Sequence, residues 1–177
     1  MKKRYKALIG AAVIVLVCLL IFPVPVKIDK TVHAVEVAID DDSFCAPVNV
    51  TISGTYRWRL LGKDSFRGDI SFDAYALTVE NALVQTDSIA ALTQQDGGDF
   101  LDYGKWMDSQ MFGYMSWKPF FSKFVVQVYV PDGNGGGEWN DSDGHCIVGG
   151  AESREGALKV LKRFSNIHLP PYENWTD

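Results

Sequence analysis

Polar and apolar residues alternate with a period of two along residues 48–60. The even positions are apolar apart from one glycine, and they carry Val48, Val50, Ile52, Tyr56, Trp58 and Leu60. A period of two over this length is typical of a strand with one buried face. Gly54 falls in phase on the inner face, where it would allow a bend or a bulge. We expect this strand to open an antiparallel sheet.

A second strand is expected after a turn at residues 61–65. One face carries Phe66, Gly68, Ile70 and Phe72, and the apolar set then shifts to Tyr75, Leu77 and Val79. This slip of one residue near Asp73 is typical of a bulge or a corner. The two strands together predict a β-hairpin.

Further strands are indicated in the second half of the chain. Asp96-Gly97-Gly98 predicts a turn between strands at 89–92 and 100–106, although residues 88–94 would also suit a short helix. Another strand is expected within 116–130, where apolar residues alternate up to Pro131, and residues 146–148 form a short apolar run.

The period changes near the C-terminus. Ala157, Val160, Leu161 and Phe164 are spaced as on one face of a helix, and Ser153 is a suitable N-cap. We therefore predict an α+β fold that is mainly β. It consists of an antiparallel meander of about six strands with one C-terminal helix packed on it.

The N-terminus predicts a transmembrane helix. Residues 7–22 are uncharged, and residues 23–26 extend the run to the length that a helix needs to cross a bilayer. The basic residues precede the run, which places the N-terminus in the cytoplasm and the rest outside, as in a single-pass protein of the cell membrane. A cleaved signal peptide and a lipoprotein modified at Cys18 remain alternatives.

This interpretation divides the chain into four parts. Residues 1–26 form the basic end and the anchor, 27–44 a membrane-proximal stalk, 45–166 an extracytoplasmic β-rich domain, and 167–177 a tail. The 177 residues have a net charge of −5, but all 22 acidic residues follow the apolar run, and 13 basic residues oppose them there. The resulting charge of −9 argues against nucleic acid and anionic surfaces and permits cations, basic partners or neutral glycans.

The cysteines predict one disulfide. With Cys18 in the apolar run, Cys45 and Cys146 remain as an even pair, and in an oxidising compartment such a pair is expected to form a bond. The alternative is two reduced, buried thiols that act as small apolar residues.

A polar loop suggests a calcium site. Its candidate ligands, at positions 1, 3, 7, 9 and 12 of a twelve-residue frame, are Asp132, Asn134, Glu138, Asn140 and Asp143. Oxygen ligands at such spacing can surround Ca²⁺. The flanks are typical of strands rather than the helices of an EF-hand, so the alternative is a long hairpin loop.

Aromatic residues are concentrated between positions 103 and 124. Trp106 and Trp117 are the candidate binding residues, because exposed rings can stack on sugars or line a peptide groove. The alternative is that these aromatics form the core and cross-strand pairs.

No catalytic motif is apparent in the sequence. The acidic pairs lie in polar loops, and neither a Gly-x-Ser-x-Gly turn nor a phosphate loop before a helix is present. We therefore expect neither an enzyme nor a cofactor, calcium aside.

Several segments carry a resemblance to known proteins. Residues 147–151 followed by 154–158, the early Gly54-Thr55-Tyr56 and the stretch from Phe66 to Ile70 resemble small single-span proteins of Gram-positive bacteria. That family has no assigned activity, so the resemblance implies a topology and a location. The overall expectation is a non-catalytic, membrane-anchored extracytoplasmic domain for binding or assembly with a cell-envelope protein or glycan. A Ca²⁺-dependent binding module and an enzyme with an unrecognised site are the alternatives.

Overall fold

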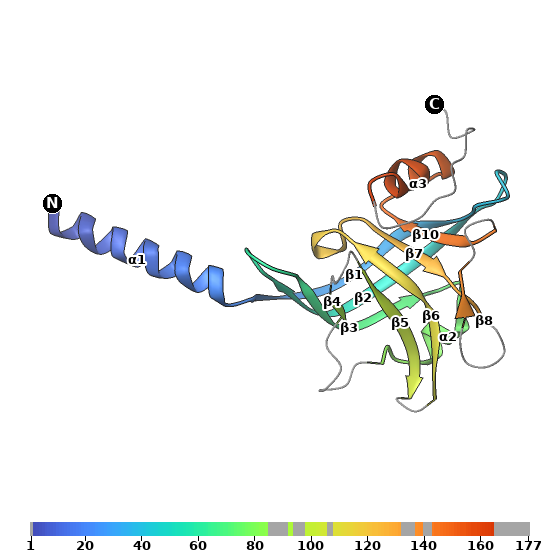
Figure 1. Ribbon diagram of the computed structural model, residues 1–177, viewed down its shortest axis with the longest axis horizontal. Coiled ribbons are helices and arrows are strands. Elements are labelled where there is room, and N and C mark those ends of the chain that lie inside the picture. The colour runs from blue at the N-terminus through green and yellow to red at the C-terminus, as the bar shows by residue number, and fades with distance from the viewer. Residues whose placement is uncertain are drawn as a thin grey trace.

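An eight-stranded antiparallel sheet with the strand order β4-β3-β2-β1-β10-β7-β6-β5 dominates the computed structural model (Figure 1). The structure describes residues 2–84, 92–93, 98–105, 108–131, 137–139 and 143–164. The elements are α1 (Lys2–Ile21), β1 (Val24–Ala38), β2 (Cys45–Trp58), β3 (Ser65–Phe72), α2 (Ala76–Glu80), β4 (Leu92–Thr93), β5 (Gly98–Lys105), β6 (Asp108–Trp117), η1 (Pro119–Phe121), β7 (Phe124–Val128), β8 (Val130–Pro131), β9 (Gly137–Glu138), β10 (His145–Gly149) and α3 (Arg154–Leu161).

The sheet curls until its two edges meet. The Tyr103 hydroxyl on β5 donates to the Ile70 carbonyl on β3 at 2.6 Å. The segment after α2 lies between these strands, because the Val84 N–H donates to the Asp102 carbonyl at 2.8 Å and the Leu83 N–H to Asp69 Oδ1 at 3.1 Å. The interior is therefore enclosed much as in a small barrel.

The inner face follows the predicted alternation and is packed with aromatic rings. Tyr56, Phe66 and Phe72 are fully buried there. Phe121 closes one end, where its ring stacks on Trp117 at 5.7 Å. Gly54 forms no bulge; it pairs with Gly68, and the Phe66 ring packs against both glycines.

The turn between β6 and β7 covers this end of the interior. Phe120 and Phe121 have φ values of 56° and 50°, a left-handed conformation that is costly for residues with a side chain. Lys30, which points inward from β1, donates to both of their carbonyls at 2.8 and 3.2 Å. The Lys30 ammonium thus supplies hydrogen bonds to two backbone carbonyls of the strained turn.

The outer face carries the predicted C-terminal helix. α3 packs Ala157, Val160 and Leu161 on a second apolar cluster formed mainly by β1, β7 and β10. Ser153 caps the helix and accepts a hydrogen bond from the Gly156 N–H at 3.2 Å. The mainly β fold with one C-terminal helix is confirmed.

The stalk expected at residues 27–44 is not observed. Most of these residues belong to β1, which pairs with β2 from Val24 opposite Trp58 to Val37 opposite Cys45. The pattern was obscured because Lys30 and Glu36 occupy inward positions that are otherwise apolar.

The transmembrane helix expected for residues 7–26 is also wrong. α1 ends at Ile21, and Val24–Val26 already form the start of β1. The uncharged part of the helix therefore spans Ala7–Ile21, roughly 22 Å at 1.5 Å per residue, against about 30 Å of hydrocarbon. Among the helices of the described chain, none combines the length and the hydropathy required to cross a bilayer. Figure 1 shows α1 projecting away from the sheet.

Two further expectations need correction. Residues 75–79, expected as a strand, lie largely in the helix α2, because the chain turns away from the sheet after Phe72. The second hairpin has different partners: β4 pairs with β3, and β5 pairs with β6.

Candidate functional site at one end of the sheet

Glu36 provides the most unusual side chain of the sheet interior. It lies on β1 between Ala46 of β2 and Ile147 of β10, so it points to the same side as the core. Its side chain is only 9% exposed, and Oε1 lies 2.6 Å from Nδ1 of His145. A carboxylate in such a place requires a hydrogen-bonding partner, and the imidazole supplies it.

Tyr75 is a second partner of this carboxylate. Burial raises the pKa of Tyr75 above its usual value, and the charge of Glu36 and a hydrogen bond to it raise that pKa further. The phenol therefore remains protonated and can donate to Glu36. Its ring packs edge-on against Phe112 at 4.9 Å, which fixes its orientation.

His145 is held from several sides while part of it faces solvent. The Phe44 ring lies 5.0 Å from the imidazole, and Trp139 Nε1 donates to the His145 carbonyl at 3.3 Å. The side chain of His145 is nevertheless 40% exposed. An oriented imidazole is thus presented at the surface on a rigid strand.

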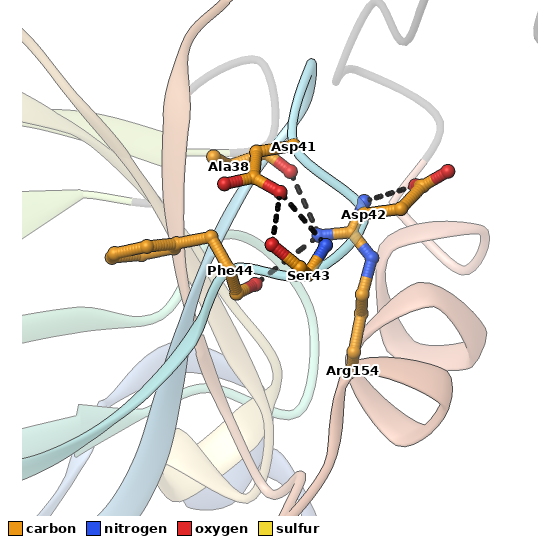
Figure 2. Close-up of polar contacts among 6 residues, drawn as sticks. All are labelled: Ala38, Asp41, Asp42, Ser43, Phe44 and Arg154. Carbon is orange, nitrogen blue, oxygen red and sulfur yellow. Dashed lines mark hydrogen bonds and ion pairs between the residues drawn. The ribbon is translucent and has the colours of Figure 1, made fainter.

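Arg154 fixes the adjacent turn between β1 and β2 (Figure 2). Its Nη1 donates to the carbonyls of Ala38 and Phe44 at 2.8 and 3.3 Å, and Nη2 lies 2.8 Å from Asp42 Oδ1. These contacts tie both ends of the turn to the start of α3. The turn that carries Phe44 is therefore held at fixed positions relative to His145.

Asp41 stabilises the same turn from within. Its Oδ1 accepts from the N–H and the hydroxyl of Ser43 at 2.8 and 2.6 Å, as Figure 2 shows. The Ser43 hydroxyl is the main reason that the pKa of Asp41 lies below its usual value. Such side-chain-to-backbone bonds are typical of Asp in turns.

Exposed carboxylates surround this site. We call this surface the acidic end; its exposed residues are Asp40, Asp41, Asp42, Asp73, Glu80 and Asp143. They come from the β1–β2 turn, the segment after β3, and the residues before β10. Within segments 36–44, 73–80 and 143–145, no Lys or Arg offsets them, and Arg154 enters from α3.

The predicted calcium ligands are only partly described. Asp132, Asn134 and Asn140 lie outside the described residues, Glu138 is seen as part of β9, and Asp143 is exposed just before β10. Among the residues whose positions are described, no group of three or more His, Cys, Asp or Glu could hold a metal ion. The calcium site therefore stays a prediction.

The disulfide between Cys45 and Cys146 is contradicted. Both cysteines are free, and both lie opposite Val37, on the two strands that flank β1. Strands are about 4.8 Å apart, so two steps separate the Cα atoms by roughly 10 Å, beyond the limit of about 7 Å for a disulfide. The bond is prevented because a strand that the sequence did not reveal lies between them.

Cys146 is also a poor nucleophile. It is fully buried on the α3 side of the sheet, and burial raises the pKa of its thiol to about 12. Successive strand residues face opposite sides, so this thiol points away from His145. A thiolate–imidazole pair is therefore not formed.

Of the two aromatic candidates, the structure describes one. Trp117 is fully buried in the core, as the alternative interpretation expected, and Trp106 lies outside the described residues. The sequence did not single out Glu36 or Tyr75. The available signal was one carboxylate within the otherwise apolar stretch from Ala34 to Ala38.

The Glu36–His145 pair has defined chemical uses. A carboxylate on Nδ1 orients the ring, which makes the imidazole a directed hydrogen-bonding group for a ligand or an acid–base group. No family model, curated protein or solved structure matches the chain. The resemblance to small proteins of Gram-positive bacteria therefore stays a prediction.

Proposed function

We propose that this chain is a non-catalytic binding or assembly domain that recognises a basic protein or a glycan of the cell envelope through its acidic end. The observation that supports the proposal best is the Glu36–His145 pair. It holds a half-exposed imidazole at a fixed position among carboxylates that point to solvent.

Charge and rigidity support the same proposal. A surface with one sign of charge attracts partners of the opposite sign and accelerates their encounter. The contacts of Arg154 fix the turn before any partner arrives, so less conformational entropy is lost on binding. The extracytoplasmic location expected from the sequence stays a prediction.

The test is retention of envelope components on the immobilised full chain. We expect the wild type to retain a basic protein or a glycan, and the double variant D40N/D143N to retain at least about tenfold less. Within the described part of the chain, neither aspartate side chain has a hydrogen-bond or ion-pair partner. The matched control is D108N/E155Q, which removes two exposed carboxylates on β6 and α3, outside the acidic end, and is expected to bind like the wild type. Equal retention by all three proteins, or no retention by any, would contradict the proposal.

An enzyme with an unrecognised site is the second candidate, because a carboxylate–imidazole pair also serves acid–base catalysis. The variant H145Q separates the two functions. Turnover of an envelope ester or glycoside by the wild type, lost in H145Q, would favour the enzyme. Partner retention without any turnover would favour the binding domain.

A further inference from the structure

The end of the sheet opposite the acidic end is strongly basic. The name basic end is used for Lys27, Arg57, Arg59, Lys63, Lys118 and Lys123, of which all but Lys123 are exposed. They belong to the first part of β1, the end of β2, the β2–β3 turn and the β6–β7 turn. Figure 1 shows the β1–β2 and β2–β3 turns at opposite ends of the sheet.

Few acidic residues oppose these charges. In segments 22–30, 56–64 and 118–123 the carboxylates belong to Asp29 and Asp64. Asp64 is buried, where it accepts from the Tyr56 hydroxyl at 2.7 Å and from the Arg59 N–H at 2.8 Å. The basic end is therefore positive although the chain as a whole is negative.

Both ends also expose apolar side chains. Leu60 and Leu61 are 43% and 66% exposed in the β2–β3 turn, between Arg59 and Lys63. At the acidic end, Val79 is 59% exposed next to Glu80. Apolar contacts surrounded by charged residues are the usual composition of a protein interface.

We infer that the basic end of one copy of this chain binds the acidic end of a second copy. The two ends carry complementary charges, and both expose apolar side chains. A second copy of the chain therefore fits either end better than an unrelated protein does. Because the two surfaces differ, the contact is heterologous and leaves one free end of each kind, so association continues head to tail. The inference rests on the proposed function in that it uses the same acidic end.

The first experiment is sedimentation of the full chain as a function of salt. A non-ionic detergent in every sample keeps the exposed apolar helix α1 from driving association. At about 10 mM salt, where the screening length is about 30 Å, we expect the mass to rise with concentration; at about 1 M salt, where it is about 3 Å, we expect a monomer. Apolar association would not weaken in this way. A monomer at low salt, or association that persists at 1 M, overturns the inference.

Charge reversal identifies the two surfaces. The variant R59E/K63E has only its acidic end intact, and D40K/D143K has only its basic end intact. Each is expected to be monomeric alone, because its altered end has lost most of its charge and no longer attracts the intact end of a second copy. An equimolar mixture is expected to form a dimer that does not grow further, since one native contact remains. Association of either variant alone, or a monomeric mixture, overturns the head-to-tail contact.

The controls separate this inference from the proposed function. Retention of an envelope partner by a wild type that stays monomeric would support partner binding and overturn self-association. Binding of poly-glutamate by that monomer would assign the basic end to an unrelated acidic protein. Conversely, salt-dependent self-association without any retained partner would support the inference and contradict the envelope partner.

Discussion

Gly149 lies in close contact with an aromatic ring on the neighbouring strand β7. It pairs with Phe124, and a Cβ at position 149 would overlap the Phe124 ring. Because Phe124 is fully buried, the ring cannot move into solvent. We expect G149A to lower the free energy of unfolding by about 1–3 kcal/mol, as overpacking does. Urea denaturation measures this change.

Gly156 is the matched control for this substitution. The nearest atom to a Cβ at position 156 is Ser153 Oγ at 3.4 Å, an ordinary contact. G156A is therefore expected to be neutral or to stabilise by up to about 1 kcal/mol, because alanine favours the helix. Equal free energies of unfolding for the two variants would contradict the packing at Gly149.

The cysteines can be distinguished by their reactivity. Cys18 and Cys45 are exposed and Cys146 is buried, and all three are free. We expect a thiol reagent such as DTNB to modify two thiols in the native chain and three in denaturant. The mass of the unreduced protein should equal that of the fully reduced protein. A loss of two hydrogens, with a peptide that links Cys45 to Cys146, would contradict the strand order around Val37.

At the scale of elements, Arg154 connects α3 with the β1–β2 turn. Its side chain is mostly buried, at 15% exposure, and its guanidinium donates to the carbonyls of Ala38 and Phe44. We expect R154M to destabilise the fold by about 1.5–3 kcal/mol, the range for hydrogen bonds of charged groups. Thermal unfolding provides the measurement.

The control on the same helix is Lys159, which pairs with Glu155 one turn away. Both side chains of this pair are more than two-thirds exposed, at 69% and 79%. Such exposed pairs are screened by solvent and contribute little, so K159M should change stability very little. Similar losses for R154M and K159M would show that Arg154 does not fix the turn.

The elements also show how far the sequence could predict the fold. β2, β3 and α3 were found because their buried positions are uniformly apolar or glycine, and Ser153 marks the start of α3. β1 was missed because Lys30 and Glu36 interrupt its inward positions. Lys30 donates to a carbonyl of the strained β6–β7 turn, and Glu36 contacts the imidazole of His145. The local pattern thus failed at the residues with a special task, as is common at such sites.

The candidate site depends on pairings that sequence distance conceals. Glu36 and His145 are 109 positions apart, and Asp42 and Arg154 are 112 apart. Each pair meets because β10 and the start of α3 return to β1, a topology that periodicity does not specify. The sequence could predict a negative domain, but the separation of its charges into two ends required the order of the strands.

At the scale of the whole molecule, the buried tyrosine phenols and the buried cysteine thiol predict a loss of stability at high pH. Burial raises the pKa of Tyr56, Tyr75 and Tyr103, and it raises that of Cys146 from 9.0 to about 12. Between pH 9 and 12 the unfolded chain loses these protons while the folded chain keeps them. The native state then binds more protons, so the free energy of unfolding falls as the pH rises.

We therefore expect stability to be fully present below about pH 9 and to decline above it, beginning with the thiol and continuing with the phenols near pH 10. Urea denaturation at intervals from pH 7 to pH 11 measures the decline. The variant C146A removes the first contribution, so its slope between about pH 8.5 and 10 should be shallower than that of the wild type. A stability that is constant up to pH 11 would contradict the burial of these groups. An unchanged slope in C146A would contradict the burial of Cys146 beneath α3.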